Sequence, residues 1–198
     1  MEVRDPYQAP AAVLTATPSA PVVPGVIEEE WVHPELFAPS TGKLVVMSLT
    51  SLGLYVLYWF YRNWRAIADQ EGTAIWPFWR AVFAPLWGFS CFAQLNRYAS
   101  GRRRQLAFPP VVLALVYLLI NAVANWSVLF PRDFGRNLWV LGLFTFLPLL
   151  PMNSLMRGYQ QSLRMDMRRQ DRLTVWHVLV IVFGGLFVGL ALLGALLR

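Results

Sequence analysis

The sequence has few of the side chains on which catalytic and metal-binding sites depend. It contains one cysteine, Cys91, and two histidines, His33 and His177, which lie far apart along the chain. A single thiol excludes an intrachain disulfide and a thiol-based metal site. The sequence also lacks a His-Glu-x-x-His motif and a glycine-rich phosphate loop followed by lysine. We therefore expect a protein that is not an enzyme and that holds no metal and no other cofactor.

Charge is scarce as well. Charged residues make up 14% of the chain and hydrophobic residues 57%, whereas soluble domains carry about 25% charged residues. The hydrophobic residues concentrate in five runs, at residues 44–61, 82–98, 111–130, 138–156 and 175–197. At least three runs are long enough to cross a bilayer, which takes about 20 helical residues. These runs predict an all-α fold, a polytopic helical membrane bundle with four or five transmembrane helices.

The second run decides between four and five spans. It lies at the lower limit of length, so it either crosses the bilayer or forms a re-entrant helix. Pro148 and Pro151 predict a break in the run at 138–156. No acidic residue lies inside any run, although proton-coupled transporters usually carry one there. Arg80, just before the second run, is expected to extend toward the membrane surface.

Two regions differ in composition. Residues 1–40 are rich in proline, which disfavours helix and sheet, and they contain no continuous apolar stretch typical of a signal peptide. They predict a flexible tail, and residues 41–198 predict the helical membrane domain. The end of the first run is crowded with aromatic residues: Tyr55, Tyr58, Trp59, Phe60, Tyr61 and Trp64. Because Trp and Tyr favour the headgroup region, we expect this helix to leave the membrane there.

Basic residues outnumber acidic ones, 17 to 11. Leu155, Tyr159, Leu163 and Met167 recur every four residues, so residues 155–172 predict a basic amphipathic helix on the membrane surface. Basic loops favour the anionic cytoplasmic leaflet, which indicates membrane lipids and not nucleic acid as the partner. The residues expected to contact anionic lipid or a partner protein are Arg102, Arg103, Arg104, Arg157, Arg164, Arg168, Arg169 and Arg172.

Small and polar residues inside the runs offer two further interpretations. Gly185 and Gly189 form a G-x-x-x-G pattern in the last run, which predicts close helix packing, either within the bundle or in a homo-oligomer. Asn121 and Asn125 share one helix face, where they form interhelical hydrogen bonds or line a polar cavity. A possible polar path through the membrane comprises Ser48, Ser51, Asn121 and Asn125.

One segment resembles a known group of proteins. Ser51, Gly53, Tyr55, Tyr58 and Trp59 form a Thr/Ser-x-Gly-x-Tyr-x-x-Tyr-Trp pattern, followed by Asn63-Trp64. This pattern resembles the first membrane helix of an uncharacterised family of small bacterial inner-membrane proteins. The resemblance covers residues 36–98 and implies a multi-pass protein of the bacterial inner (cytoplasmic) membrane, with no activity attached.

Three functional hypotheses follow. The leading one is a non-catalytic membrane protein that acts as an interaction or scaffold component on anionic lipid or a partner. The alternative is a small oligomeric channel or transporter, which requires the polar residues to converge on one cavity. A further alternative, suggested only by small size and the lack of catalytic residues, is an immunity-type protein against a membrane-acting toxin.

Overall fold

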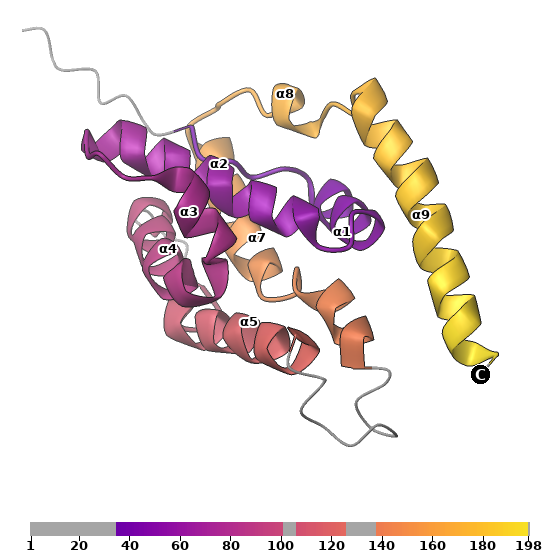
Figure 1. Ribbon diagram of the computed structural model, residues 1–198. Coiled ribbons are helices and arrows are strands. Elements are labelled where there is room, and N and C mark those ends of the chain that lie inside the picture. The colour runs from indigo at the N-terminus through magenta and orange to yellow at the C-terminus, as the bar shows by residue number, and fades with distance from the viewer. Residues whose placement is uncertain (1–34, 101–105, 126–137, 198) are drawn as a thin grey trace, which may run out of the picture. The chain divides into compact units, whose positions relative to one another are not determined.

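The structure is a computed structural model that describes residues 35–100, 106–125 and 138–197 (Figure 1). These residues are all-helical, and no strand occurs among them. The elements in chain order are α1 (Thr41–Thr50), α2 (Leu54–Glu71), α3 (Pro77–Val82), α4 (Ala84–Ala99), α5 (Pro110–Asn125), the 3-10 helix η2 (Leu138–Phe144), α7 (Leu149–Ser162), α8 (Arg168–Asp171) and α9 (Val175–Leu196). The all-α prediction is confirmed, whereas most of the predicted tail, residues 1–34, lies outside the described residues.

The first apolar run forms two helices in place of the single predicted one. The chain breaks between α1 and α2, where Leu52 and Gly53 adopt φ values of 54° and 85°. Glycine adopts this left-handed conformation without a steric penalty, whereas leucine does so at a cost. The hydroxyl of Ser51 accepts a hydrogen bond of 2.9 Å from the backbone N–H of Tyr55, in the first turn of α2. Neither half alone provides the membrane-spanning helix expected for residues 44–61.

Proline lies near the start of a helix in two other runs. The run at 82–98 forms α4 almost whole, since α3 ends at Val82 and Phe83 precedes α4. Pro85 lies in the first turn of α4, where its missing N–H is tolerated. The run at 138–156 changes from the 3-10 helix η2 to α7 at Pro148, which confirms the break predicted there.

Two helical stretches are long and apolar enough to cross a membrane. They are Val140–Ser162 and Arg168–Ala195, and no residue in the most apolar part of the second is buried. At 16 residues, α5 is apolar but shorter. Two candidate spans are therefore present in the described part of the chain, and four or five are not confirmed.

The core forms around α2. Its Trp59, Phe60 and Trp64 are fully buried. The ring centroid of Phe60 lies 5.1 Å from that of Tyr117 on α5 and 5.7 Å from that of Phe92 on α4. These three α2 residues were expected to contact the headgroup region, but neighbouring helices enclose them, so their rings contact protein. Aromatic packing between helices stabilises this cluster.

Candidate functional site

An extended segment, Leu36–Ser40, is the most heavily hydrogen-bonded part of the structure outside the helices, and we call it the strap. It has no helical conformation, and Leu36, Phe37 and Ala38 are buried. An extended backbone makes no hydrogen bonds within itself, so burial leaves its N–H and C=O groups in need of partners. Side chains from α2, α7 and α8 supply those partners.

Asn63 of α2 binds one residue of the strap twice. Its Oδ1 accepts from the Phe37 N–H at 3.0 Å, and its Nδ2 donates to the Phe37 carbonyl at 3.1 Å. Asn63 is fully buried, so an apolar replacement would leave both groups unsatisfied in the interior. This residue follows the tyrosine-tryptophan pattern of the first run.

Helix α7 contacts the strap through three side chains in successive turns. Asn153 Nδ2 donates to the Pro39 carbonyl at 2.8 Å, Arg157 donates to the Ala38 carbonyl at 3.1 Å, and Gln160 Nε2 donates to the Leu36 carbonyl. The Asn153 amide oxygen in turn accepts from the indole N–H of Trp59 at 3.2 Å. The strap is thereby linked to the aromatic core.

The short helix α8 closes the other side of the strap. Gln170 Oε1 accepts from the Ala38 N–H, and Asp171 Oδ1 accepts from the Ser40 N–H, both at 2.8 Å. Lys43 Nζ donates to the Gln170 and Arg172 carbonyls at 2.9 and 2.8 Å. These contacts join the start of α1 to α8, and α9 begins four residues after α8 ends.

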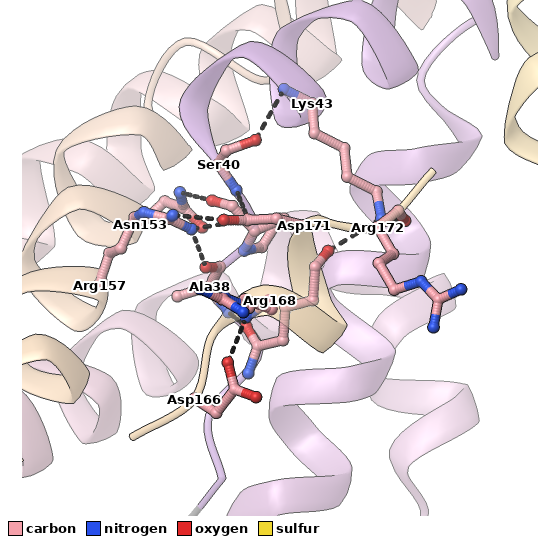
Figure 2. A network of polar contacts seen from close by, with 11 residues as sticks. Ala38, Ser40, Lys43, Asn153, Arg157, Asp166, Arg168, Asp171 and Arg172 are labelled. Atoms are coloured by element: carbon pink, nitrogen blue, oxygen red, sulfur yellow. Dashed lines mark hydrogen bonds and ion pairs between the residues drawn. The ribbon is translucent and has the colours of Figure 1, made fainter. Parts of the chain in front are cut away.

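Arg157 and Asp171 form the only ion pair in the described part of the chain. Its geometry is bidentate, with N–O distances of 2.8 and 2.5 Å, and Figure 2 shows the Asp171 carboxylate between Arg157 and Ser40. The hydrogen bonds from Arg157, with help from the Ser40 N–H, lower the pKa of Asp171 below its ordinary value. The carboxylate therefore stays charged where it holds the strap.

The predicted amphipathic helix 155–172 is wrong as a continuous element. Helix α7 ends at Ser162 and α8 begins at Arg168. Arg164 has a φ of 56°, while the Arg164 and Met165 N–H groups bond the carbonyls of Gln161 and Gln160. This is the hydrogen-bond pattern of a Schellman helix end. Arg157 was expected to face lipid or a partner, but it pairs with Asp171 instead.

The other arginines of this segment remain on the surface. Arg164, Arg168, Arg169 and Arg172 are exposed, and no acidic side chain among the described residues pairs with them. We call these four residues the basic surface. The exposed Leu173, Val175 and Trp176 follow directly. The predicted contacts at Arg102, Arg103 and Arg104 lie outside the described residues.

The residues of the predicted polar path are divided between two hollows that flank the break after α1. Ser51 lines an apolar hollow of about 570 Å³ that faces Phe183 and Phe187 of α9. Asn121 and Asn125 line a second hollow of about 400 Å³ beside η2, and Ser48 is buried. Both asparagines donate to carbonyls of their own helix at 2.9 Å, and both line a hollow, which is the other alternative expected for them. Neither of the two hollows is lined by Ser51 together with the asparagines.

Close packing of the last helix depends on a glycine that the G-x-x-x-G pattern does not include. A Cβ at Gly184 would lie 1.9 Å from the Thr50 carbonyl oxygen, so only glycine fits against α1. A Cβ added at Gly185 would lie at an ordinary distance, 3.6 Å from a Thr50 methyl group, and one added at Gly189 would meet nothing within 4 Å. The adjacent Gly184-Gly185 pair was the sequence signal for this contact, but a search for glycines four positions apart does not select Gly184.

Comparisons with known proteins add no family. No protein-family model, curated protein or solved structure matches the chain. The resemblance of residues 36–98 to small inner-membrane proteins therefore stays a prediction. The structure nevertheless explains two positions of that pattern, because Gly53 permits the helix break and Asn63 holds the strap.

Proposed function

We propose that this is a non-catalytic, multi-pass protein of the bacterial inner membrane, an interaction or scaffold component whose basic surface rests on anionic lipid. The observation that carries this proposal is the junction of α8 and α9. Four exposed arginines precede a 22-residue helix without a charged residue, and the exposed Trp176 lies in the first turn of that helix.

The exposure of α9 supports a lipid environment. Val182, Phe183, Leu186, Phe187 and Leu190 are each about 60% exposed. Burial of apolar surface stabilises a protein in water by about 25 cal/mol per Å², so an uncovered helix of this composition is unfavourable there. Hydrocarbon carries no such penalty, and α9 is long enough to cross it.

The basic surface supports contact with an anionic leaflet. Each Lys or Arg near such a surface contributes about 1 kcal/mol, so four arginines contribute about 4 kcal/mol at low salt. Trp176, which is 75% exposed at the first turn of α9, suits the headgroup region. Arg157 is not counted, because Asp171 neutralises it.

The strap gives this surface a fixed position. Strap contacts tie α8 to α1, α2 and α7, so Arg168 and Arg169 lie on a helix that is held at several points. A scaffold needs such a rigid surface to present a constant pattern of charge.

Extraction and lipid dependence test the proposal together. We expect the full-length protein to stay in the membrane pellet at alkaline pH, and release into the aqueous fraction would contradict the membrane assignment. In nanodiscs, we expect a higher Tm with phosphatidylglycerol than with phosphatidylcholine, and this difference should shrink in the R168Q/R169Q double variant.

The R65Q/R97Q variant is a matched control. It also removes two charges from exposed arginines on helices, but both lie outside the basic surface. We expect it to keep the full lipid dependence of Tm. Equal losses in the two double variants would mean that net charge alone, not the basic surface, responds to the lipid.

A further inference from the structure

Arg80 on α3 is held between two tryptophans. The central carbon of its guanidinium lies 4.5 Å from the ring centroid of Trp64 and 4.4 Å from that of Trp87. Trp64 comes from α2 and is fully buried, whereas Trp87 comes from α4 and is partly exposed. Cation–π contacts of this kind restrain the plane of the guanidinium but leave its edge available.

The edge of this guanidinium has no acceptor in the described part of the chain. Arginine carries five N–H donors, yet no hydrogen bond or ion pair joins Arg80 to any described residue. The indole N–H of Trp64 is likewise buried without a partner. Arg80 and Trp64 therefore offer N–H donors and a positive charge without a partner. An anionic acceptor from outside the protein would satisfy them.

Exposed aromatic side chains lie along the same helix. Trp76, Phe78, Trp79 and Phe83 are each more than half exposed. Exposed tryptophan rings such as those of Trp76 and Trp79 favour the level of lipid headgroups. A phosphate group is the anionic acceptor found at that level, and arginine binds phosphate through paired N–H donors.

We propose that Arg80, positioned by Trp64 and Trp87, binds the phosphate group of a membrane phospholipid. The site is separate from the basic surface, because it holds one cation in an aromatic setting and not a row of exposed charges. It rests on the proposed membrane location but not on the scaffold role.

Native mass spectrometry of the full-length protein in detergent tests the site by counting bound lipids. The probes are phosphatidylglycerol, diacylglycerol with the same chains, and inorganic phosphate. We expect R80Q to weaken binding of the first phosphatidylglycerol about tenfold or more, and to leave diacylglycerol binding unchanged. The matched control R65Q, which removes the charge of an exposed α2 arginine, should change either affinity less than twofold.

Each other outcome overturns the proposal. Equal effects of R80Q and R65Q would show that Arg80 is not the phosphate ligand. Equal wild-type affinity for diacylglycerol would show that the phosphate is not recognised, and full competition by inorganic phosphate would assign the site to a free anion.

A second variant covers the case in which R80Q does not fold. Trp87→Leu removes one wall of the cage at a partly exposed position and keeps the charge of Arg80. We expect it to weaken phosphatidylglycerol binding severalfold, and unchanged binding would count against the cage. The failure of the scaffold proposal would appear instead in the R168Q/R169Q variant, with Arg80 binding intact.

Discussion

Helices α2 and α9 show opposite relations between composition and burial. Helix α2 carries Arg62, Arg65, Asp69 and Glu71 among its 18 residues, yet its Trp59, Phe60 and Trp64 are fully buried. Helix α9 has no charged residue in 22, yet no residue in its most apolar part is buried. The most hydrophobic helix is therefore not the core of the protein. Protein side chains surround α2, and we propose that lipid surrounds the exposed face of α9.

Tryptophan truncation on the two helices should show the largest contrast. Trp59→Ala removes a fully buried ring that also donates a hydrogen bond to Asn153, and we expect a loss of about 3–5 kcal/mol in stability. Trp176→Ala at the exposed start of α9 should cost less than about 0.5 kcal/mol in detergent. Thermal or denaturant unfolding measures both, and equal losses would contradict the division between core and lipid-facing helix.

The contact between α9 and α1 can be broken at one glycine. Gly184→Ala places a methyl group against the Thr50 carbonyl, where the ideal Cβ position is only 1.9 Å away, and we expect a cost of about 1–3 kcal/mol from overpacking. Gly189→Ala is the control, since its Cβ meets nothing within 4 Å. Unfolding midpoints of the two variants measure the difference. A larger loss at Gly189 would favour the G-x-x-x-G interpretation and would assign that glycine to a contact between protein copies.

Loss of the ion pair should lower stability less than the substitution of Gly184 does. Asp171→Asn keeps the shape of the side chain but removes the charge that pairs with Arg157 and accepts from Ser40. We expect a loss of about 1–2 kcal/mol, because hydrogen bonds to charged groups contribute about 1.5–3 kcal/mol and this site is partly exposed. Asp166→Asn, at an exposed carboxylate, should change stability by less than about 0.5 kcal/mol. Equal losses of stability in the two variants would show that the contact of Asp171 with the strap is not the cause of the destabilisation.

The lowered pKa of the Asp171 carboxylate also predicts the direction of a pH effect on stability. This effect should be the smallest of the four predicted effects. Because the pKa of Asp171 is lower in the folded protein than in the unfolded chain, its contribution to stability is complete above the ordinary carboxyl pKa of about 3.9. It is lost as the pH falls through the lowered folded pKa. We expect the difference in Tm between the wild type and Asp171→Asn to shrink as the pH is lowered below 4. A difference that grows on acidification would contradict the assigned ion pair.

Part of the structure was predictable because it depends on neighbours along the chain. Apolar periodicity and length predicted α5 and α9, and the prolines predicted the break before α7. The break at Leu52-Gly53 was missed, since a leucine with positive φ is unfavourable in isolation. The end of α7 at Ser162 was missed for a similar reason, because Arg164 takes the left-handed position that glycine usually occupies.

The candidate site was less predictable, since its contacts join distant residues. Arg157 belongs to a basic row in the sequence, and only the approach of Asp171 and the Ala38 carbonyl turns it toward the interior. Gln160 and Gln170 gave no sequence signal at all, yet both bind the Leu36 carbonyl. Polar side chains at helical spacing look alike whether they face solvent or a buried backbone.

The sequence by itself determined the helical class and the exposed character of α9, because local conformation and transfer into lipid depend on the side chains of one continuous segment. Only the tertiary structure decided which polar residues are buried, which glycine admits a neighbouring backbone and which arginine is neutralised. Several of these outcomes follow from hydrogen bonds and close contacts between residues more than a hundred positions apart, and the ion pair joins residues 14 positions apart on two separate helices. A local sequence pattern does not show which distant residues will become neighbours, because their donors and acceptors meet only when the chain folds.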